Sequence, residues 1–263
     1  MQLSDSHVRL CASADSRYGV ALARQSAPRL TGEDDMTKNW FIAVLLCGAA
    51  TAQAQDSGLS VSVGVRGWNT QWDTFSYAGN PQVVTQSPAN EKFVLVPLLS
   101  MRYRDFVGSL SLYPSTDHSF IDGSTGNRKE LDLNLGYYVS PGVAVTLGYK
   151  KLEQSDGSNI YALSGPVLGV NGTASLGRDF SLYGTFGLGR LKTTSASTVQ
   201  FSSADYRLSE VGLAYTLATP SIAKAVTFTL GYRTQVLSSK DAAEGQDGRD
   251  LTQGLTLGFV TTF

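Results

Sequence analysis

Four charged residues stand at matching distances from two predicted turns, and their spacing favours ion pairs. Asp132 and Lys150 flank the segment VSPGV, and Glu210 and Arg233 flank the segment TPSIA. On one face of an antiparallel hairpin, directly opposed side chains are in contact, and opposite charges there attract. These residues predict an ion-paired polar interior or a gate for ions. The registers that this requires pair Val139 with Val143 and Leu217 with Val226.

A catalytic interpretation would need a general base, and His118 is the only histidine beyond residue 54. It lies in YPSTDHSFIDG (113–123), beside Asp117 and near Ser115 and Ser119, and hydrolases and acyl-transfer enzymes use such residues as base and nucleophile. Adjacent residues of an extended chain point to opposite sides, however, and the sequence offers no matching acidic pair. We therefore expect a solvated loop histidine and no enzyme. The sequence also lacks metal-ligand clusters and nucleotide-binding motifs, so no metal or cofactor is expected.

Alternating segments provide the elements that must position these residues. Apolar residues recur with a period of two, and each segment is about as long as a tilted strand that crosses a membrane. The sequence predicts an all-β, antiparallel, up-and-down transmembrane β-barrel of about ten strands, or eight if two segments are misassigned. The ten segments are 59–72, 92–104, 106–114, 128–139, 143–153, 161–176, 180–192, 204–218, 225–238 and 250–263.

The predicted connections alternate between two lengths. Outer-membrane barrels have short periplasmic turns and long extracellular loops, and the same alternation is expected here. An even number of strands then places both ends of the barrel on the periplasmic side. The short connections are at 104–105, 139–143, 176–180 and 218–225, and the long ones at 73–91, 114–127, 154–160, 193–203 and 239–249.

The two faces of the predicted strands differ in composition. A water-soluble barrel also alternates, but its apolar face points inward and its outer face would be rich in Lys and Glu. Here the less apolar face carries mainly Gly, Ser and Thr, whereas the apolar face carries Leu, Val and many aromatic residues. This composition is typical of a barrel with lipid outside and a crowded polar lumen inside.

Seven charged residues are predicted to point into the lumen. Five lie at similar distances from the short turns and form a predicted charge layer: Arg66, Asp132, Lys150, Glu210 and Arg233. The other two are Arg102 and Glu130. Small barrels fill with side chains, so the layer is either the polar core of a closed barrel or the gate of a narrow pore. Bulky lumen residues would narrow the path further, namely Trp68, Tyr138 and Tyr183.

The front of the chain predicts export. Residues 36–54 combine a basic start at Lys38, an apolar core and the A-x-A site Ala52-Gln53-Ala54, the pattern of a secretory signal peptide. Residues 1–35 have no sustained period, and we interpret them as a misplaced translation start or a disordered extension. The barrel then spans 55–263. The whole chain has 21 Lys and Arg against 22 Asp and Glu, which argues against a nucleic-acid partner.

The signal peptide, the hairpin LGYYVSPGVAVTLGYK (135–150) and the final strand GLTLGFVTTF resemble the bacterial outer-membrane β-barrel superfamily. The resemblance implies a porin-like, monomeric protein in the outer membrane of a Gram-negative cell envelope. Outer-membrane lipid and lipopolysaccharide would surround it. It also implies that the last strand is the signal for the barrel-assembly machinery, although Thr261 departs from the apolar residue preferred there. The residues that match this signal are Leu255, Leu257, Phe259 and Phe263.

Two further functions stay open on the sequence. The ten-stranded surface proteases called omptins use Asp and His at the barrel rim, so His118 with Asp117 makes an omptin-like protease a minor alternative. Alternatively, the long loops bind a ligand while the barrel anchors them, since loops on a rigid scaffold commonly carry function. The loop predicted at 73–91 is the longest candidate, but its composition identifies no partner.

Overall fold

A computed structural model describes residues 58–78, 82–156, 159–196, 201–219, 223–243 and 246–263. The predicted extension 1–35 and signal peptide 36–54 lie outside these ranges. Within them, no helix has the length and apolar character needed to cross a membrane.

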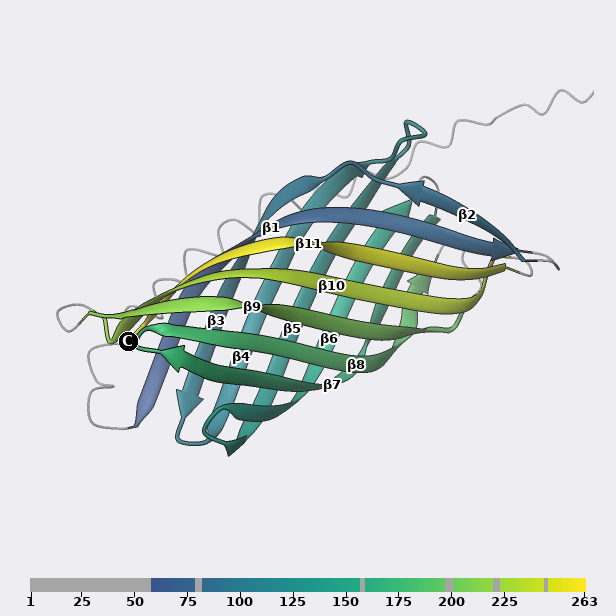
Figure 1. Ribbon diagram of the computed structural model, residues 1–263. Coiled ribbons are helices and arrows are strands. Elements are labelled where there is room, and N and C mark those ends of the chain that lie inside the picture. Colours follow the sequence, from purple (N-terminus) through teal and green to yellow (C-terminus); the bar gives the residue numbers. More distant parts are fainter. Residues whose placement is uncertain (1–57, 79–81, 157–158, 197–200, 220–222, 244–245) are drawn as a thin grey trace, which may run out of the picture. The chain divides into compact units, whose positions relative to one another are not determined.

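The described chain forms a closed antiparallel barrel of ten strands with one additional strand, β2 (Figure 1). Each barrel strand pairs with its neighbours in the chain, apart from the interposed β2, and β11 pairs with β1 to close the sheet. Closure gives each of the ten strands a partner on both sides, although β3 and β4 pair only through Leu98–Tyr103 and Phe106–Ser111. The strands are β1 (Leu59–Ala78), β2 (Val83–Pro88), β3 (Lys92–Tyr103), β4 (Phe106–Ser119), β5 (Thr125–Ser140), β6 (Val143–Asp156), β7 (Asn159–Gly177), β8 (Phe180–Ala196), β9 (Ser203–Ala218), β10 (Ala225–Ala243) and β11 (Gln246–Thr262).

The prediction of an antiparallel barrel with ten strands is confirmed, and the alternative of eight is wrong. The long loops, however, were predicted too long, because the strands continue into them. The predicted loop 154–160 is mostly strand, since β6 runs to Asp156 and β7 begins at Asn159. The predicted loop 73–91 contains the end of β1 and all of β2, which pair with each other beyond the place where β1 leaves β3 (Figure 1).

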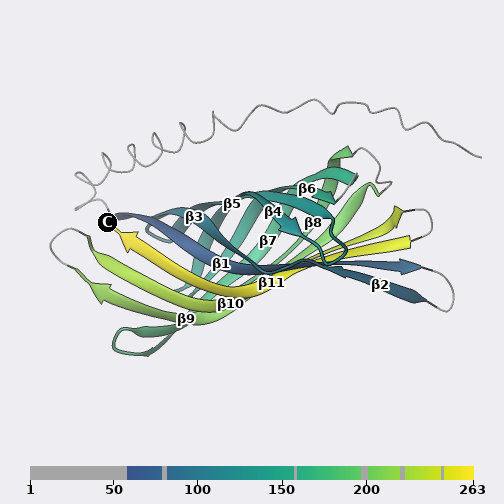
Figure 2. The same ribbon diagram turned by 90° about the horizontal axis from the view of Figure 1, so that it is seen from above.

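The two ends of the barrel differ. Turns at 104–105, 141–142 and 178–179 define one end, here called the short-turn end, where the chain also finishes beside the start of β1 (Figure 2). Arg104 and Arg178 adopt φ values of 54° and 46° in two of these turns. The opposite end, here called the hairpin end, holds the connections that follow β1, β4, β6, β8 and β10.

The outer face of the barrel is apolar and exposed. Leu135, Leu147 and Leu168 are 65%, 63% and 60% exposed, whereas inward-facing side chains at the middle of the strands are largely buried. Outward charged residues gather toward the hairpin end, among them Lys129, Lys151, Glu153, Arg190 and Asp205.

Aromatic residues on the outer face form a row near the short-turn end. Phe180, Tyr215, Phe228 and Phe259 occupy paired positions on four consecutive strands, β8 to β11. Ring centroids of neighbouring pairs lie 4.7 Å apart for Phe180 with Tyr215 and 5.4 Å apart for Phe228 with Phe259. Such tilted ring pairs are favourable and stabilise the two halves of the row.

Candidate functional site

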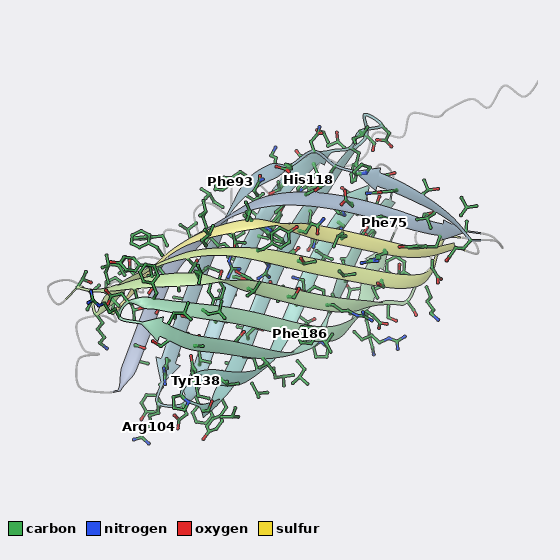
Figure 3. The ribbon with its side chains drawn as sticks, viewed as in Figure 1. Phe75, Phe93, Arg104, His118, Tyr138 and Phe186 are labelled. Carbon is green, nitrogen blue, oxygen red and sulfur yellow. The ribbon has the colours of Figure 1, made fainter. Side chains whose placement is uncertain are left out.

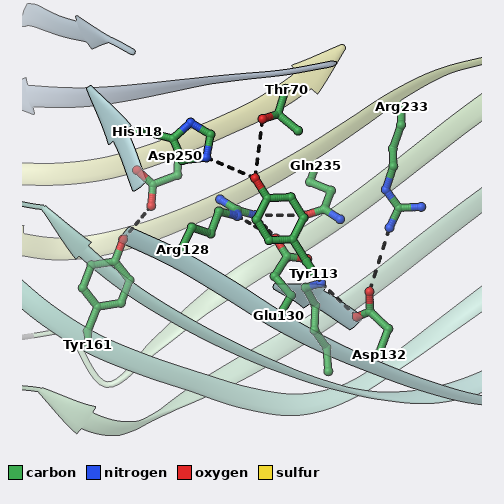
Figure 4. Close-up of polar contacts among 11 residues, drawn as sticks. Thr70, Tyr113, His118, Arg128, Glu130, Asp132, Tyr161, Arg233, Gln235 and Asp250 are labelled. Carbon is green, nitrogen blue, oxygen red and sulfur yellow. Dashed lines mark hydrogen bonds and ion pairs between the residues drawn. The ribbon is translucent and has the colours of Figure 1, made fainter. Parts of the chain in front are cut away.

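Seven charged side chains form one connected set inside the barrel, here called the charge network. Lys150 Nζ donates to Glu130 Oε2 at 2.5 Å and to Asp132 Oδ1 at 2.8 Å. Arg128 Nε donates to Glu130 Oε1 at 2.6 Å (Figure 4). The network therefore crosses from β5 to β6 through carboxylates that each contact more than one cation.

The second half of the network surrounds Glu210. Arg233 Nη1 donates to Glu210 Oε2 at 2.9 Å, and Tyr183 Oη donates to Glu210 Oε1 at 3.1 Å. Arg66 lies 3.6 Å from Glu210 Oε2. Arg233 also lies 3.9 Å from Asp132, which joins the two halves across the lumen (Figure 4). The complete network is Arg66, Arg128, Glu130, Asp132, Lys150, Glu210 and Arg233.

The structure places all five residues of the predicted charge layer in this network. Asp132 pairs with Lys150 and Glu210 with Arg233 in the strand registers. One turn pairing was wrong: Ser140, not the predicted Val139, lies opposite Val143, because β5 has an irregularity between Tyr138 and Ser140. The irregularity lies beyond the Asp132–Lys150 pair and leaves that register unchanged.

Two residues differ from the prediction. Glu130, predicted outside the layer, bridges Arg128 and Lys150. Arg128 was not singled out, although the strand period puts it on the same face as Glu130. Arg102 does not join the network, since its guanidinium lies 4.2 Å from the ring centroid of Tyr138 and its Nε donates to Arg104 O. Figure 3 shows Tyr138 and Arg104 together at the short-turn end.

Aromatic side chains cover the network on its hairpin side. Trp68, Trp72, Tyr113, His118 and Phe120, here called the aromatic plug, are each 4% exposed or less. Their rings meet edge-on, with centroids 5.2 to 5.9 Å apart. Arg233 lies 5.3 Å from the ring of Trp68, and Lys150 lies 4.9 Å from the ring of Tyr206. A ring over a desolvated cation adds cation–π attraction.

A second group of buried side chains completes the filling of the hairpin half. Leu152, Leu163, Leu191, Tyr206 and Leu237 belong to one buried apolar cluster, with exposures from 0 to 4%. These residues come from β6 to β10, whereas the aromatic plug comes from β1 and the β4 hairpin. Together the two groups leave the hairpin half of the lumen packed with side chains.

The expectation that His118 lies in a solvated loop is wrong. Its side chain is buried in the plug, and its Nε2 is 3.1 Å from the hydroxyl of Tyr113. Asp117 points elsewhere, since its Oδ1 accepts a hydrogen bond from Asn127 on the exposed side of the hairpin. The structure therefore separates His118 from its neighbouring carboxylate and keeps it away from the barrel surface.

A cavity of about 320 Å³ lies on the short-turn side of the network. Its lining includes five charged residues of the network and the uncharged polar residues Ser62, Ser100, Ser109, Ser111, Asn134, Thr146, Asn171 and Thr185. Between the network and the plug there is a space of only about 10 Å³, about enough for a single water molecule. The lumen is therefore hollow on one side of the network and closed on the other.

The terminal strand forms the seam of the barrel. Leu255, Leu257 and Phe259 are exposed on its outer face. The backbone N–H of Phe263 donates to Val61 O at 2.8 Å, so the last residue is bonded to β1. This position gives the predicted assembly signal a structural part in closing the sheet.

The fold and site define a class: a closed ten-stranded barrel with an apolar exterior and a charged, partly filled interior. No protein-family model and no curated protein matches the chain. Among solved structures, the outer membrane protease OmpT from Escherichia coli is similar at 12% identity and a TM-score of 0.48, over 80% of this chain and 98% of that one.

Two further solved structures are also similar. The toluene transporter TodX of Pseudomonas putida matches at 8% identity and a TM-score of 0.30, over 79% of this chain and 90% of that one. A Pseudomonas aeruginosa FadL homologue matches at 8% identity and a TM-score of 0.29, over 78% and 89% of the two chains. The likeness is one of fold alone.

Proposed function

We propose that this chain is an outer-membrane barrel whose lumen is closed by the charge network and the aromatic plug, so that its role is structural and it does not conduct ions. The observation that supports this proposal is the burial of the charge network. The side chains of Arg128, Lys150, Glu130 and Glu210 are each 1 or 2% exposed. A conducting path would have to pass these paired charges and the packed rings behind them.

The outer face supports a membrane location. Contiguous apolar surface of this extent is rare on soluble monomers, and outer-membrane barrels carry such a band between aromatic girdles. The row Phe180, Tyr215, Phe228 and Phe259 marks one boundary of this band, and outward charges such as Lys151 mark the other. Outer-membrane lipid and lipopolysaccharide would contact the surface between them, with the short-turn end in the periplasm.

The terminal strand supports a further part of the proposal. Leu255, Leu257, Phe259 and Phe263 would be read by the barrel-assembly machinery, and the bonding of Phe263 to Val61 would complete the seam. Self-pairing of the ten strands favours a monomer. Deletion of Phe263 should lower the amount of assembled barrel in the outer membrane, as measured by heat-modifiable migration on a gel.

Planar-bilayer recording of the purified barrel tests closure. The wild type should give no ion-conductance steps, whereas removal of the ring that covers Arg233, in Trp68→Ala, should give small, intermittent steps. Phe93→Ala serves as the control, because Phe93 is 57% exposed on the outer face. Trp40→Ala is unsuitable, because Trp40 lies in the predicted signal peptide. Stable conductance of the wild type would refute the closed barrel.

A narrow gated pore is the second candidate, favoured by the hollow beside the network. Arg66 and Asp132 are 20% and 18% exposed in their side chains and border the cavity, so part of the network is already accessible. In this function Lys150 would exchange partners between Glu130 and Asp132 to open a path. Absence of conductance in both the wild type and Lys150→Ala would exclude it.

An enzymatic role is disfavoured by the position of His118. A general base must reach the proton that it abstracts, and His118 is 1% exposed and packs against the ring of Trp72. We expect His118→Ala to leave cleavage of a basic peptide by intact cells unchanged. A loss of such cleavage would support the omptin-like alternative instead.

A further inference from the structure

The cavity on the short-turn side of the charge network has the size and lining of a ligand site. Its volume of about 320 Å³ falls at the lower end of the range typical of small-molecule pockets, about 300–1,000 Å³. Its walls combine eight serine, threonine and asparagine side chains with leucine, valine, aromatic and glycine residues, and five charged residues of the network border it. The five charges and eight polar side chains suit a small molecule that carries a charge and several hydroxyl groups.

Arg66 is the cation of this surface with the most unused hydrogen-bonding capacity. Within the described chain its one ion pair is with Glu210, at 3.6 Å, which is longer than a normal hydrogen bond. Glu210 is already bonded to Arg233 at 2.9 Å and to Tyr183 at 3.1 Å. The five N–H donors of Arg66 are therefore largely available, and its side chain is the most exposed in the network.

The charge count of the network favours an anion. Ion pairs link four cations and three carboxylates, so the linked set carries one excess positive charge. Bidentate contact with a carboxylate is the geometry that a guanidinium prefers. A monoanion beside Arg66 would balance the set.

The uncharged walls favour hydroxyl groups on the same ligand. Among the described residues, the side chains of Ser109, Asn134 and Asn171 have no hydrogen-bond partner, and all three border the cavity. Inward residues on the short-turn side are half-buried, as Ser62, Asn134 and Asn171 show, whereas those on the hairpin side are buried. Access is therefore open from the short-turn end and closed from the other.

We infer that this cavity binds a small hydroxylated carboxylate, with Arg66 holding the carboxylate and Ser109, Asn134 and Asn171 holding hydroxyl groups. This site goes beyond the proposed closed barrel, which neither requires nor excludes it. A barrel closed on its hairpin side would take the ligand up and release it at the short-turn end.

Isothermal titration calorimetry of the full-length, folded barrel in detergent tests the inference, with D-gluconate as the probe and D-glucitol as its uncharged counterpart. Gluconate should bind, and glucitol should bind at least about tenfold more weakly, as the loss of a charge-assisted contact implies. Absence of gluconate binding, or equal affinity for both compounds, would overturn the inference.

Matched variants locate the site. Arg66→Gln should weaken gluconate binding about 10- to 100-fold, while Arg102→Gln removes an equal charge from another inward arginine outside the cavity and should leave binding unchanged. Asn171→Leu keeps every network charge and should weaken binding by filling the cavity. Equal effects of the two arginine variants, or unchanged binding in Asn171→Leu, would refute the assignment.

Folding and conductance are measured separately from binding. Heat-modifiable migration on a gel shows whether each variant is folded before titration, and Arg66→Lys provides a second variant that keeps the charge and should retain more affinity than Arg66→Gln. Bilayer recording of the same samples reports on closure. A conducting barrel that binds gluconate would therefore refute the proposed function alone.

Discussion

Replacement of Glu130 by Gln should be the most destabilising conservative change in the lumen. The Glu130 side chain is 2% exposed and accepts hydrogen bonds from Arg128 at 2.6 Å and from Lys150 at 2.5 Å. Glutamine keeps the shape but removes the negative charge between two buried cations. Removing one partner of a buried ion pair costs roughly 3–5 kcal/mol, because the remaining charge loses its compensation in a poorly solvated site.

Glu153 provides a matched control. It also bridges two cations, Lys129 and Lys151, each at 2.8 Å, but its side chain is 34% exposed on the outer face. Exposed pairs contribute about 0–1 kcal/mol, since water solvates the separated charges. Two glutamates with the same number of cationic partners thus differ mainly in burial, and the expected difference in unfolding free energy is roughly 2–5 kcal/mol.

Urea unfolding of the folded barrel in detergent, followed by the fluorescence of Trp68 and Trp72, measures this difference. Glu130→Gln should lower the midpoint by roughly 1 M urea or more, whereas Glu153→Gln should leave it nearly unchanged. The double variant Glu130→Gln with Arg128→Met should recover part of the loss, because Arg128 has its ion pair with Glu130 and would otherwise stay buried and unpaired. Equal midpoints for the two single variants would show that the lumen is well solvated and refute the reasoning.

The remaining predictions concern a close approach and a pH response. Gly212→Ala should destabilise the barrel by about 1–3 kcal/mol in thermal unfolding, because its Cβ would clash with the backbone oxygen of Leu230 and come 2.6 Å from the Tyr183 ring. Gly184→Ala, whose Cβ would meet its nearest atom at 3.7 Å, should have a smaller effect. Hydrogen bonds from the hydroxyl and N–H of Ser124 hold the pKa of the exposed Asp122 below its ordinary value. The stabilisation that these hydrogen bonds give the turn is therefore present above the ordinary pKa of an aspartate. It is lost as the pH falls through the lowered pKa of Asp122. NMR titration should show the pKa of Asp122 rising in Ser124→Ala, and an unchanged pKa would contradict this cause.

The period of two in the sequence could predict the strands, their faces and the position of the network. Hairpins next to short turns have registers that depend on local sequence, and for this reason Glu210 could be placed opposite Arg233 before the fold was known. The length of the strands at the hairpin end could not be predicted from composition. Residues such as Ser, Gly and Asp are typical of loops, yet here pairing with an existing neighbouring strand continues the strands through them.

The burial of His118 shows where the alternation of inward and outward residues fails to predict which side chains face the lumen. Tyr113 faces the lumen, and an unbroken period of two would place Ser115 and Asp117 on the same face. The β4–β5 register shifts between Tyr113 and Thr116, so Thr116 and His118 face inward instead. A bulge reverses the two faces of a strand, and Pro114, which has no backbone N–H to donate, is the residue of this segment that could mark its position in the sequence.

The barrel, its apolar exterior and the pairs between adjacent strands can be predicted from the sequence, because they depend on side-chain alternation and short turns. The charges that meet across the lumen could be identified only from the three-dimensional fold. Arg233 on β10 approaches Asp132 on β5, and Arg66 on β1 approaches Glu210 on β9. In neither contact are the two strands neighbours in the sheet, so both contacts depend on closure, on the width of the lumen and on the reach of each side chain.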